Sequence, residues 1–380
     1  MSLIGTWIQT TAQSWLVFQL TNSAFLLGLV GFLGSMPIFL LSLFGGVLAD
    51  RINKRKILIA TQSAFMCLAF LLAVLTQLKI ITPFQIMLIA LFNGAVMAFD
   101  APSRQAVVVE LVGKAHLPNA IALNSVAFSS SRIIGPALAG ILVAVIGMSG
   151  CFYINGISFL AVIIALFLIR VDNSQKRQSS KPLIKDLKEG LIFVKNHPLI
   201  LILITMVGMV SLFGLSYVIL MPIFANDILK VGVKGLGLLM SCAGIGALIG
   251  ALILAHLGDF QYKGKFLIFS SIIYSLCLIL FSLSKVYLLS LLVLVLLGGT
   301  SVSAIALINT ILQARVPDIF RGRVMGVFMI TFAGIMPFGS LIAGGLAQGL
   351  GVSATVMISG VICSAFFIII NIVYPDIRRL

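Results

Sequence analysis

The sequence predicts an all-α membrane protein with twelve transmembrane helices in two six-helix bundles. Its 380 residues are 61% hydrophobic and 9% charged, a balance that the surface of a water-soluble domain cannot carry. The apolar runs are about 20 residues long, which is the length of helix that crosses a bilayer. Short polar connections separate the runs. We expect the spanning helices at residues 2–20, 25–48, 57–77, 83–103, 119–145, 150–170, 198–222, 235–257, 266–284, 287–310, 324–347 and 352–374.

The net charge of +15 is unevenly distributed between alternate connections. Of the 25 lysines and arginines, 20 fall on one side of the predicted membrane. The exceptions are Lys79, Lys230, Lys234 and Lys285 on the other side, and Arg132 within a predicted helix. Basic residues gather on the cytoplasmic side of membrane proteins. We therefore expect both termini on the cytoplasmic side of the membrane, and no nucleic-acid partner.

No cofactor or metal is expected. The five cysteines lie in apolar runs without a C-x-x-C pair, which favours small buried side chains over metal or redox chemistry. The three histidines stand alone near predicted helix ends. No Walker-type phosphate loop occurs. The glycines at 244, 246 and 250 do not follow a strand, so helix packing explains them better than dinucleotide binding.

A weak internal repeat divides the chain. The segment that starts at Val316 resembles the one that starts at Val112, an offset of 204 residues, and the same offset matches Gly135 to Gly339. Repeated halves are a common architecture of secondary transporters. We predict one bundle at residues 1–170 and a second at 198–380. The polar segment 171–197 between them is predicted to be a cytoplasmic linker, part of it an amphipathic helix on the anionic inner membrane surface.

The connection between the second and third predicted helices concentrates glycine and charge. Gly46 is expected to let two backbones approach closely, and Asn53 suits a left-handed turn. The stretch resembles the loop signature of the major facilitator superfamily, in which Gly, Asp, Arg and two basic residues recur. Here Gly46, Asp50, Arg51, Lys54 and Arg55 occupy those places.

The fourth predicted helix ends in a second charged group, and we expect Pro102 to close it. Asp100 lies at the cytoplasmic boundary. The resemblance implies that Asp100, Asp50 and Lys54 form a charge cluster that latches the inner face in one state. It further suggests that Asp50 docks at the positive helix start near Arg323. The alternative for Asp100 is a solvated carboxylate at the membrane rim.

The fifth predicted helix carries Arg132, Gly135, Pro136 and Gly140. The Gly-Pro pair resembles the antiporter motif of exporters in the superfamily. Pro136 is expected to bend the helix and the glycines to permit a tight seam, although packing alone has the same requirement. A guanidinium within a spanning helix is expensive, so Arg132 should face a cavity or a partner.

The first predicted helix has one polar face, and its amides require either helix–helix hydrogen bonds or a watery cavity. These two readings remain equal alternatives. In the superfamily the first, fourth, seventh and tenth helices line the central cavity. By resemblance, the cavity candidates are Gln9, Gln13, Asn93, Ser211, Tyr217, Thr300 and Ser303.

Further stretches, at 5–9, 99–105, 119–125 and 316–324, look like the branch that contains bacterial enterobactin exporters and macrolide efflux pumps. This resemblance implies a monomer in the bacterial cytoplasmic membrane that exports a small amphiphilic molecule by alternating access, in exchange for protons. It is not expected to be an enzyme. The alternatives are an uptake permease of the same fold and a non-transporting membrane subunit of a larger complex.

Overall fold

The computed structural model describes residues 2–168, 183–258 and 260–379, apart from the side chains of 43, 47, 49–51, 109, 110, 114, 115, 118, 183–186 and 379. Within these residues every regular element is a helix, so the all-α prediction is confirmed. The elements are α1 (Ser2–Thr21), α2 (Ala24–Arg51), α3 (Lys54–Gln77), α4 (Pro83–Leu168), α5 (Leu183–Asn196), α6 (Pro198–Met209), η1 (Val210–Gly214), α7 (Tyr217–Ile223), η2 (Phe224–Ile228), α8 (Gly232–Leu257), α9 (Lys263–Leu283), α10 (Tyr287–Arg315), α11 (Asp318–Leu350), α12 (Val352–Val373) and η3 (Pro375–Arg379).

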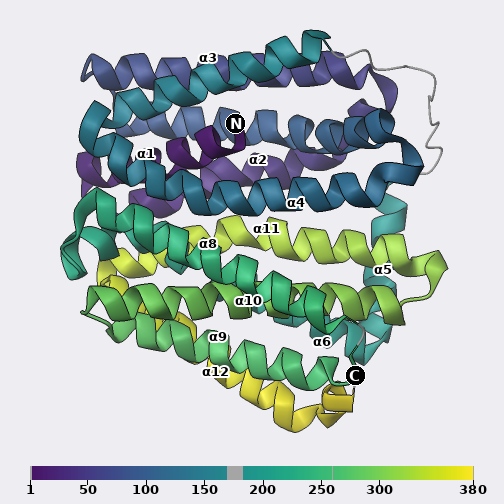
Figure 1. Ribbon diagram of the computed structural model, residues 1–380. Helices are drawn as coiled ribbons and strands as arrows, with labels where there is room; N and C mark the ends of the chain where they lie inside the picture. Colours follow the sequence, from purple (N-terminus) through teal and green to yellow (C-terminus); the bar gives the residue numbers. More distant parts are fainter. Residues whose placement is uncertain (1, 169–182, 259, 380) are drawn as a thin grey trace. The chain divides into compact units, whose positions relative to one another are not determined.

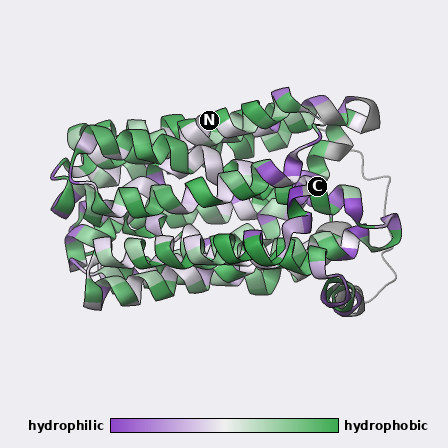
Figure 2. Ribbon diagram, turned by 90° about the horizontal axis from the view of Figure 1, so that it is seen from below, coloured by the Kyte–Doolittle hydropathy of each residue, from purple (hydrophilic) through white to green (hydrophobic). Residues whose placement is uncertain are grey.

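Ten helices of the described chain are long and apolar enough to cross a membrane. Two differences separate this number from the expected twelve. The polar-faced α1 is not among the ten, and residues 119–168 count as one stretch of 50 residues. Apolar residues run along the helices, and hydrophilic ones gather toward helix ends (Figure 2). The chain is therefore an integral membrane protein.

The long helix α4 is broken at Gly113 (φ 67°) and Gly147 (φ 75°), where the backbone adopts a left-handed conformation that favours glycine. Its three pieces, 83–112, 114–146 and 148–168, replace the predicted helices at 83–103, 119–145 and 150–170. The expectation that Pro102 closes the fourth helix is wrong, because the chain stays helical through Pro102 to the break at Gly113.

The predicted seventh helix is also interrupted. α6 passes into the π-helical η1, and α7 passes into the π-helical η2. Wide turns of this kind often mark functional segments. Two other boundaries move outward: α10 continues to Arg315, and α11 starts at Asp318 rather than at residue 324. Pro317 provides the N-cap of α11 with an extended backbone, and Asp318 in the first turn suits the positive end of the helix dipole.

The contacts divide the chain into two compact units. Unit 1 contains residues 1–180 together with 232–238, the first turns of α8. Within it α1, α2 and α3 each pack against α4 (Figure 1). Unit 2 contains residues 181–231 and 239–380. Here α9 packs between α10 and α12, while α11 contacts α5, α6 and η1.

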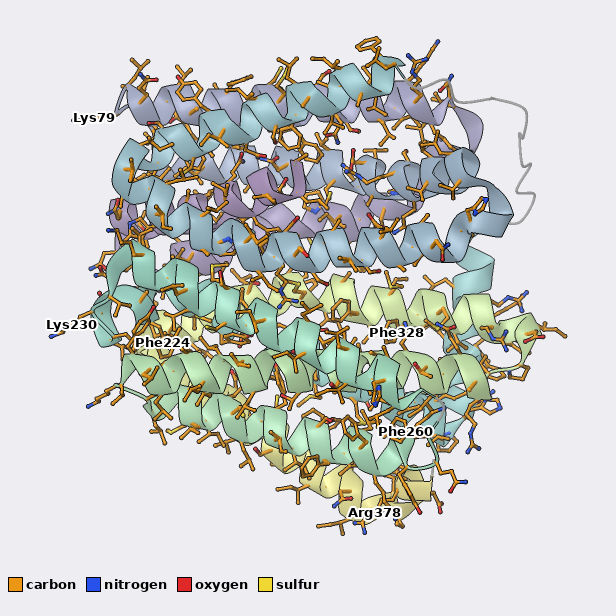
Figure 3. All side chains as sticks on the ribbon, in the orientation of Figure 1. Lys79, Phe224, Lys230, Phe260, Phe328 and Arg378 are labelled. Atoms are coloured by element: carbon orange, nitrogen blue, oxygen red, sulfur yellow. The ribbon has the colours of Figure 1, made fainter. Side chains whose placement is uncertain are left out.

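Unit 2 has two distinct ends. Lys230, in the connection before α8, lies at the end opposite to Phe260 and Arg378 (Figure 3). This is the arrangement expected if consecutive helices cross in alternate directions. Helix α5 runs across the other helices of its unit rather than along them (Figure 1).

Glycines set the closest helix crossings in both units. In unit 1, a Cβ on Gly135 would overlap Trp7 of α1; in unit 2, a Cβ on Gly339 of α11 would overlap the backbone of Ser211 and Leu212. Since 339 − 135 and 211 − 7 both equal 204, the two contacts are related by the offset seen in the sequence. The repeat is thus present in packing as well as in residue pattern.

Gly45, not Gly46, provides the close approach at the end of α2. A Cβ on Gly45 would overlap the carbonyl group of Ala98 in α4, whereas the position above Gly46 is open. The packing role of Gly246 and Gly250 is confirmed. A Cβ on either residue would overlap the backbone of α10, at Val295 and at Gly299 respectively. Small residues at such crossings let helix backbones meet within a membrane.

Candidate functional site

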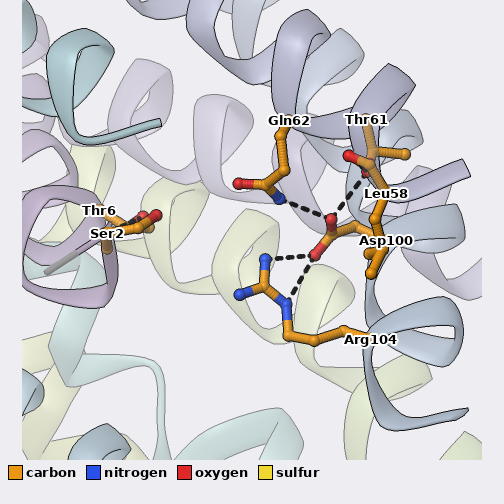
Figure 4. A network of polar contacts seen from close by, with 7 residues as sticks. All are labelled: Ser2, Thr6, Leu58, Thr61, Gln62, Asp100 and Arg104. Carbon is orange, nitrogen blue, oxygen red and sulfur yellow. Dashed lines mark hydrogen bonds and ion pairs between the residues drawn. The ribbon is translucent and has the colours of Figure 1, made fainter. Parts of the chain in front are cut away.

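The polar centre of unit 1 is the carboxylate of Asp100, which is only 1% exposed (Figure 4). Its Oδ1 accepts hydrogen bonds from Thr61 Oγ1 at 2.8 Å and from Gln62 Nε2 at 2.7 Å, both on α3. Its Oδ2 accepts from Arg104 Nε at 3.1 Å and Nη2 at 2.7 Å. Asp100 is therefore not a solvated rim carboxylate. It is a buried anion with hydrogen bonds to both of its oxygens.

Each donor reaches Asp100 because of its place on a helix. Arg104 is four residues further along α4, the spacing that brings two side chains together on one helix face. Thr61 and Gln62 lie on α3, which packs along α4. The cation that pairs with Asp100 in this structure is Arg104. The pairing with Lys54 that the resemblance implies stays a prediction.

The start of α3 is held by two separate contacts. Asn53 caps the helix, and its side-chain oxygen accepts from the backbone N–H of Arg55 and Lys56. Its φ of −56° and ψ of 111° are not left-handed, so the predicted turn is wrong. An N-cap requires an extended backbone of this kind. Arg55 then donates to the carbonyl oxygens of Leu166 at 2.6 Å and Phe167 at 2.8 Å, at the end of α4.

The predicted latch is only partly visible. Lys54 begins α3, but the side chains of Asp50 and Arg51 lie outside the described residues. Arg323, near the start of α11, forms an ion pair with Glu189 of α5, with Nη1 and Oε2 2.8 Å apart. These residues remain a prediction as a latch.

Helix α5 is fastened to α11 by more than this ion pair. Phe193 of α5 stacks on Phe320 at a centroid distance of 4.5 Å. A Cβ on Gly190 would come within 2.8 Å of the carbonyl oxygen of Arg323, so only glycine fits there without a shift. The predicted linker thus contains a helix that is docked on unit 2 through one edge, while Leu191 and Ile192 on its other edge are half exposed.

The second piece of α4 carries the antiporter-like residues. Gly135 meets α1, and Gly140 faces the backbone of Val233 and Lys234 in the part of α8 that belongs to unit 1. A Cβ on Gly237 in that same part would overlap the carbonyl oxygen of Pro136. Arg132 is partly exposed, and the structure gives its guanidinium no hydrogen bond or ion pair with a described residue.

The cavity candidates separate into two groups. Gln9 is buried, and its Oε1 accepts from Asn155 Nδ2 at 2.7 Å, so helix–helix hydrogen bonding describes it better than cavity lining. Three more are buried within unit 2: Ser211, Tyr217 and Ser303. Partial exposure is found at Gln13, Asn93 and Thr300. All seven stay predicted cavity residues, four of them buried and three partly exposed within their own units.

Sequence reasoning missed several polar partners. Thr61 and Gln62 interrupt an apolar run, and Arg104 follows Asp100 at helical spacing, so both signals were present in the sequence. Asn155 had no such local signal, because its partner Gln9 is 146 residues away. In the described part of the chain, no three His, Cys, Asp or Glu side chains are placed to hold a metal ion.

Comparison with known proteins places this arrangement in a family. A family model described as "transmembrane secretion effector" matches residues 1–378. The chain is 27% identical to the staphyloferrin A transporter of Staphylococcus aureus, over 94% of this chain and 90% of the relative. It is 24% identical to an enterobactin exporter of Shigella boydii, over 95% and 86%. It is also 23% identical to a multidrug efflux pump of Mycolicibacterium fortuitum, over 92% and 88%.

Solved structures give the same fold. A bacterial homologue of the human lysosomal transporter Spinster aligns with a TM-score of 0.75 at 14% identity, covering 99% of this chain and 95% of that one. The nucleoside transporter NupG aligns with a TM-score of 0.73, also at 14% identity, over 100% and 97%. These relatives are transporters, so the chain is not an enzyme. With a match that runs almost from end to end, this chain belongs to the transmembrane secretion effector family of the major facilitator superfamily.

Proposed function

We propose that this protein exports a small amphiphilic molecule, siderophore-like or drug-like, across the bacterial cytoplasmic membrane in exchange for protons. The observation that carries the proposal is the match over nearly the full chain to transporters named for siderophores and to a drug efflux pump. The match covers both sequence halves: 92–95% of this chain and 86–90% of these relatives.

The proposed architecture has twelve crossings in two six-helix bundles, residues 1–170 and 198–380. The helical breaks at Gly113 and Gly147 support this number, since they divide α4 into three pieces of membrane-spanning length. The glycine contacts related by the 204-residue offset support the repeat. The bundles rock about a central cavity in a monomer, with both termini cytoplasmic and the linker helix against inner-leaflet lipid.

In this mechanism Asp50, Arg51, Lys54, Asp100 and Arg323 form an inner latch that makes and breaks in each cycle. Asp50→Asn removes the carboxylate but keeps the side-chain size. It should abolish transport while leaving the amount of protein in the membrane unchanged. Full transport by Asp50→Asn in proteoliposomes would remove the latch from the mechanism.

The test of function uses the relatives' substrates as probes. The protein is expressed in a strain that lacks its own enterobactin exporter, and enterobactin and intracellular precursors are measured by mass spectrometry in medium and cells. Export predicts that an amphiphile moves from cells to medium. If the same compound instead accumulates in cells, the protein is an uptake permease.

A second measurement addresses proton coupling and the remaining alternative. The purified chain is placed in proteoliposomes with the exported compound, and a pH gradient is imposed. Proton exchange predicts concentrative movement that stops when an ionophore collapses the gradient. If the purified chain transports the compound only when a partner ATPase is added, the chain is a subunit of a larger complex.

A further inference from the structure

The pocket of Asp100 contains oxygen atoms that the structure leaves unused. Asp100 is the only acidic side chain buried in the described part of the chain. Beside it, Gln62 is 1% exposed and Ser103 is 0% exposed. Gln62 Oε1 and Ser103 Oγ are buried and have no hydrogen-bond partner. Buried polar atoms are normally paired, so one orphan on a residue bonded to Asp100 and another three residues along α4 call for an explanation.

The counter-ion of Asp100 is placed so that it can leave. The Arg104 side chain is 40% exposed, whereas Asp100 is 1% exposed. Part of the Arg104 side chain is therefore not covered by protein, and rotation of this flexible side chain would carry the guanidinium away from Asp100. Asp100 would stay behind on α4. A buried carboxylate that loses its counter-ion must gain another cation, because its charge is poorly solvated there.

We infer that Asp100, Thr61, Gln62 and Ser103 form a binding site for a small monovalent cation, a proton or a sodium ion, which exchanges with the Arg104 guanidinium. The inference rests on the proposed function, because it supplies the site at which ion movement is coupled to transport. All four residues offer oxygen atoms, and the positive group that pairs with Asp100 is the one that departs.

The Gln62 amide can bind Asp100 both when Arg104 is its partner and when a cation has replaced Arg104. In the structure its Nε2 donates to the ionised carboxylate, and its Oε1 points away from Asp100 (Figure 4). A half-turn of the terminal amide exchanges the two atoms. Oε1 can then accept the proton of a neutral Asp100 or coordinate a sodium ion. Ser103 lies three residues from Asp100 on α4, on the same side of the helix, and its unpaired hydroxyl adds a further oxygen.

The charged groups of the surrounding elements leave Arg104 as the dominant partner. The described α1 contains no charged residue. On α3 the charges are Lys54, Arg55 and Lys56 in the first turn, and Arg55 is directed at the carbonyls of Leu166 and Phe167. Thr61 lies about 9 Å further along that helix, at 1.5 Å per residue. On α2 the charges are at 50 and 51, whose side chains lie outside the described residues.

One side of the pocket is closed by apolar packing. The single hydroxyl hydrogen of Thr61 is shared between Asp100 Oδ1 and the carbonyl oxygen of Leu58, one turn earlier on α3. Leu58 in turn belongs to a buried cluster with Val107 and Leu166. A cation would therefore enter where Arg104 now lies.

The test measures cation binding by the full-length protein in detergent micelles, without any transport step. Thermal unfolding midpoints are compared in sodium chloride and in choline chloride of equal ionic strength, at alkaline pH. Proton uptake after an acid jump is measured with a pH-indicator dye. A sodium site predicts a higher midpoint in sodium for wild type and no such difference for Asp100→Asn. A proton site predicts no sodium effect, with one proton fewer taken up per chain by Asp100→Asn.

Two variants guard against a misleading result. Arg104→Gln removes the competitor, so it should move half-saturation to a lower sodium concentration or proton uptake to a higher pH. It carries the test alone if Asp100→Asn does not fold. Asp318→Asn changes an exposed acid on α11 and is the matched control, which should keep the sodium effect of wild type. It also removes one carboxylate, so in the proton measurement only Arg104→Gln distinguishes Asp100 from other acids. The inference is overturned if wild type shows neither effect, or if Arg104→Gln leaves half-saturation unchanged. Export without cation binding would refute this site and leave the proposed function standing.

Discussion

The buried amide pair of Gln9 and Asn155 offers a direct measure of whether the polar face of α1 serves packing or transport. Gln9 is 8% exposed and Asn155 is 2% exposed, and they join α1 to the third piece of α4 over 2.7 Å. Replacing either residue by leucine leaves the other amide without its partner in an apolar setting. Such an orphan costs about 1–3 kcal/mol.

The two replacements should not add. In Gln9→Leu the Asn155 Nδ2 loses its acceptor, although Asn155 Oδ1 keeps its hydrogen bond from Ser158 Oγ at 3.2 Å; in Asn155→Leu the Gln9 Oε1 loses its donor. With both residues changed to leucine no orphan remains, so the double variant should be more stable than the sum of the singles predicts. Hydrogen bonds between membrane helices show coupling of roughly 0.6 kcal/mol on average and up to about 1.7 kcal/mol. At 2.7 Å and nearly complete burial, we expect the upper half of this range, about 1–1.7 kcal/mol.

The assay is equilibrium unfolding in mixed detergent micelles, followed by circular dichroism, on the four proteins of a double-mutant cycle. Gln13→Leu, one turn further along α1 and partly exposed, is the control and should have a small effect. Transport by the double variant should stay near the wild-type rate. A coupling energy of zero, together with a changed substrate preference in Gln9→Leu, would refute the packing role and return Gln9 to the cavity.

Three other variants test separate parts of the structure. Gly298→Val should reduce the amount of folded protein in membranes, because even a Cβ at 298 overlaps the Ala243 carbonyl group. The control Gly349→Val, where the space is open, should leave that amount unchanged. Size-exclusion chromatography measures the folded protein of both variants. Glu189→Gln should change the unfolding free energy by under about 1 kcal/mol, as expected for a partly exposed ion pair. If the ion pair between Glu189 and Arg323 holds α5 in place, the same variant should speed trypsin cleavage within α5. Asp50→Asn should lower transport without lowering protein amount; equal loss of both would point to folding instead.

Helix content and the class of protein followed from the sequence because both depend on local composition. A run of 20 apolar residues has one stable solution in a bilayer. The internal offset of 204 residues likewise paired Gly135 with Gly339, and both glycines lie at close helix crossings. Helix ends were less well predicted. Whether Asn53 caps a helix or adopts a left-handed turn, and where Pro317 starts α11, depends on backbone angles that composition does not reveal.

The polar contacts were the least predictable part, and the reason is distance along the chain. Asp100 was identified as important, but its partners lie on two helices, and only Arg104 is within local range. Choosing between Lys54 and Arg104 requires knowing which way each side chain leaves its helix. The same holds for Glu189 and Arg323, which are 134 residues apart in the sequence, since 323 − 189 = 134.

Pro102 shows how the glycine crossings and the Asp100 pocket depend on one another. Proline has no N–H, so the carbonyl of Ala98, four residues earlier, loses its usual helical donor. A Cβ on Gly45 would fall on that carbonyl, which means that a Cα hydrogen of Gly45 points at it instead. Such contacts are weak, but here one reaches a carbonyl whose usual donor is missing, and α4 stays helical through Pro102. Asp100 lies between Ala98 and Pro102, in the turn that lacks this hydrogen bond. The turn that carries the buried charge therefore packs directly against α2 at Gly45.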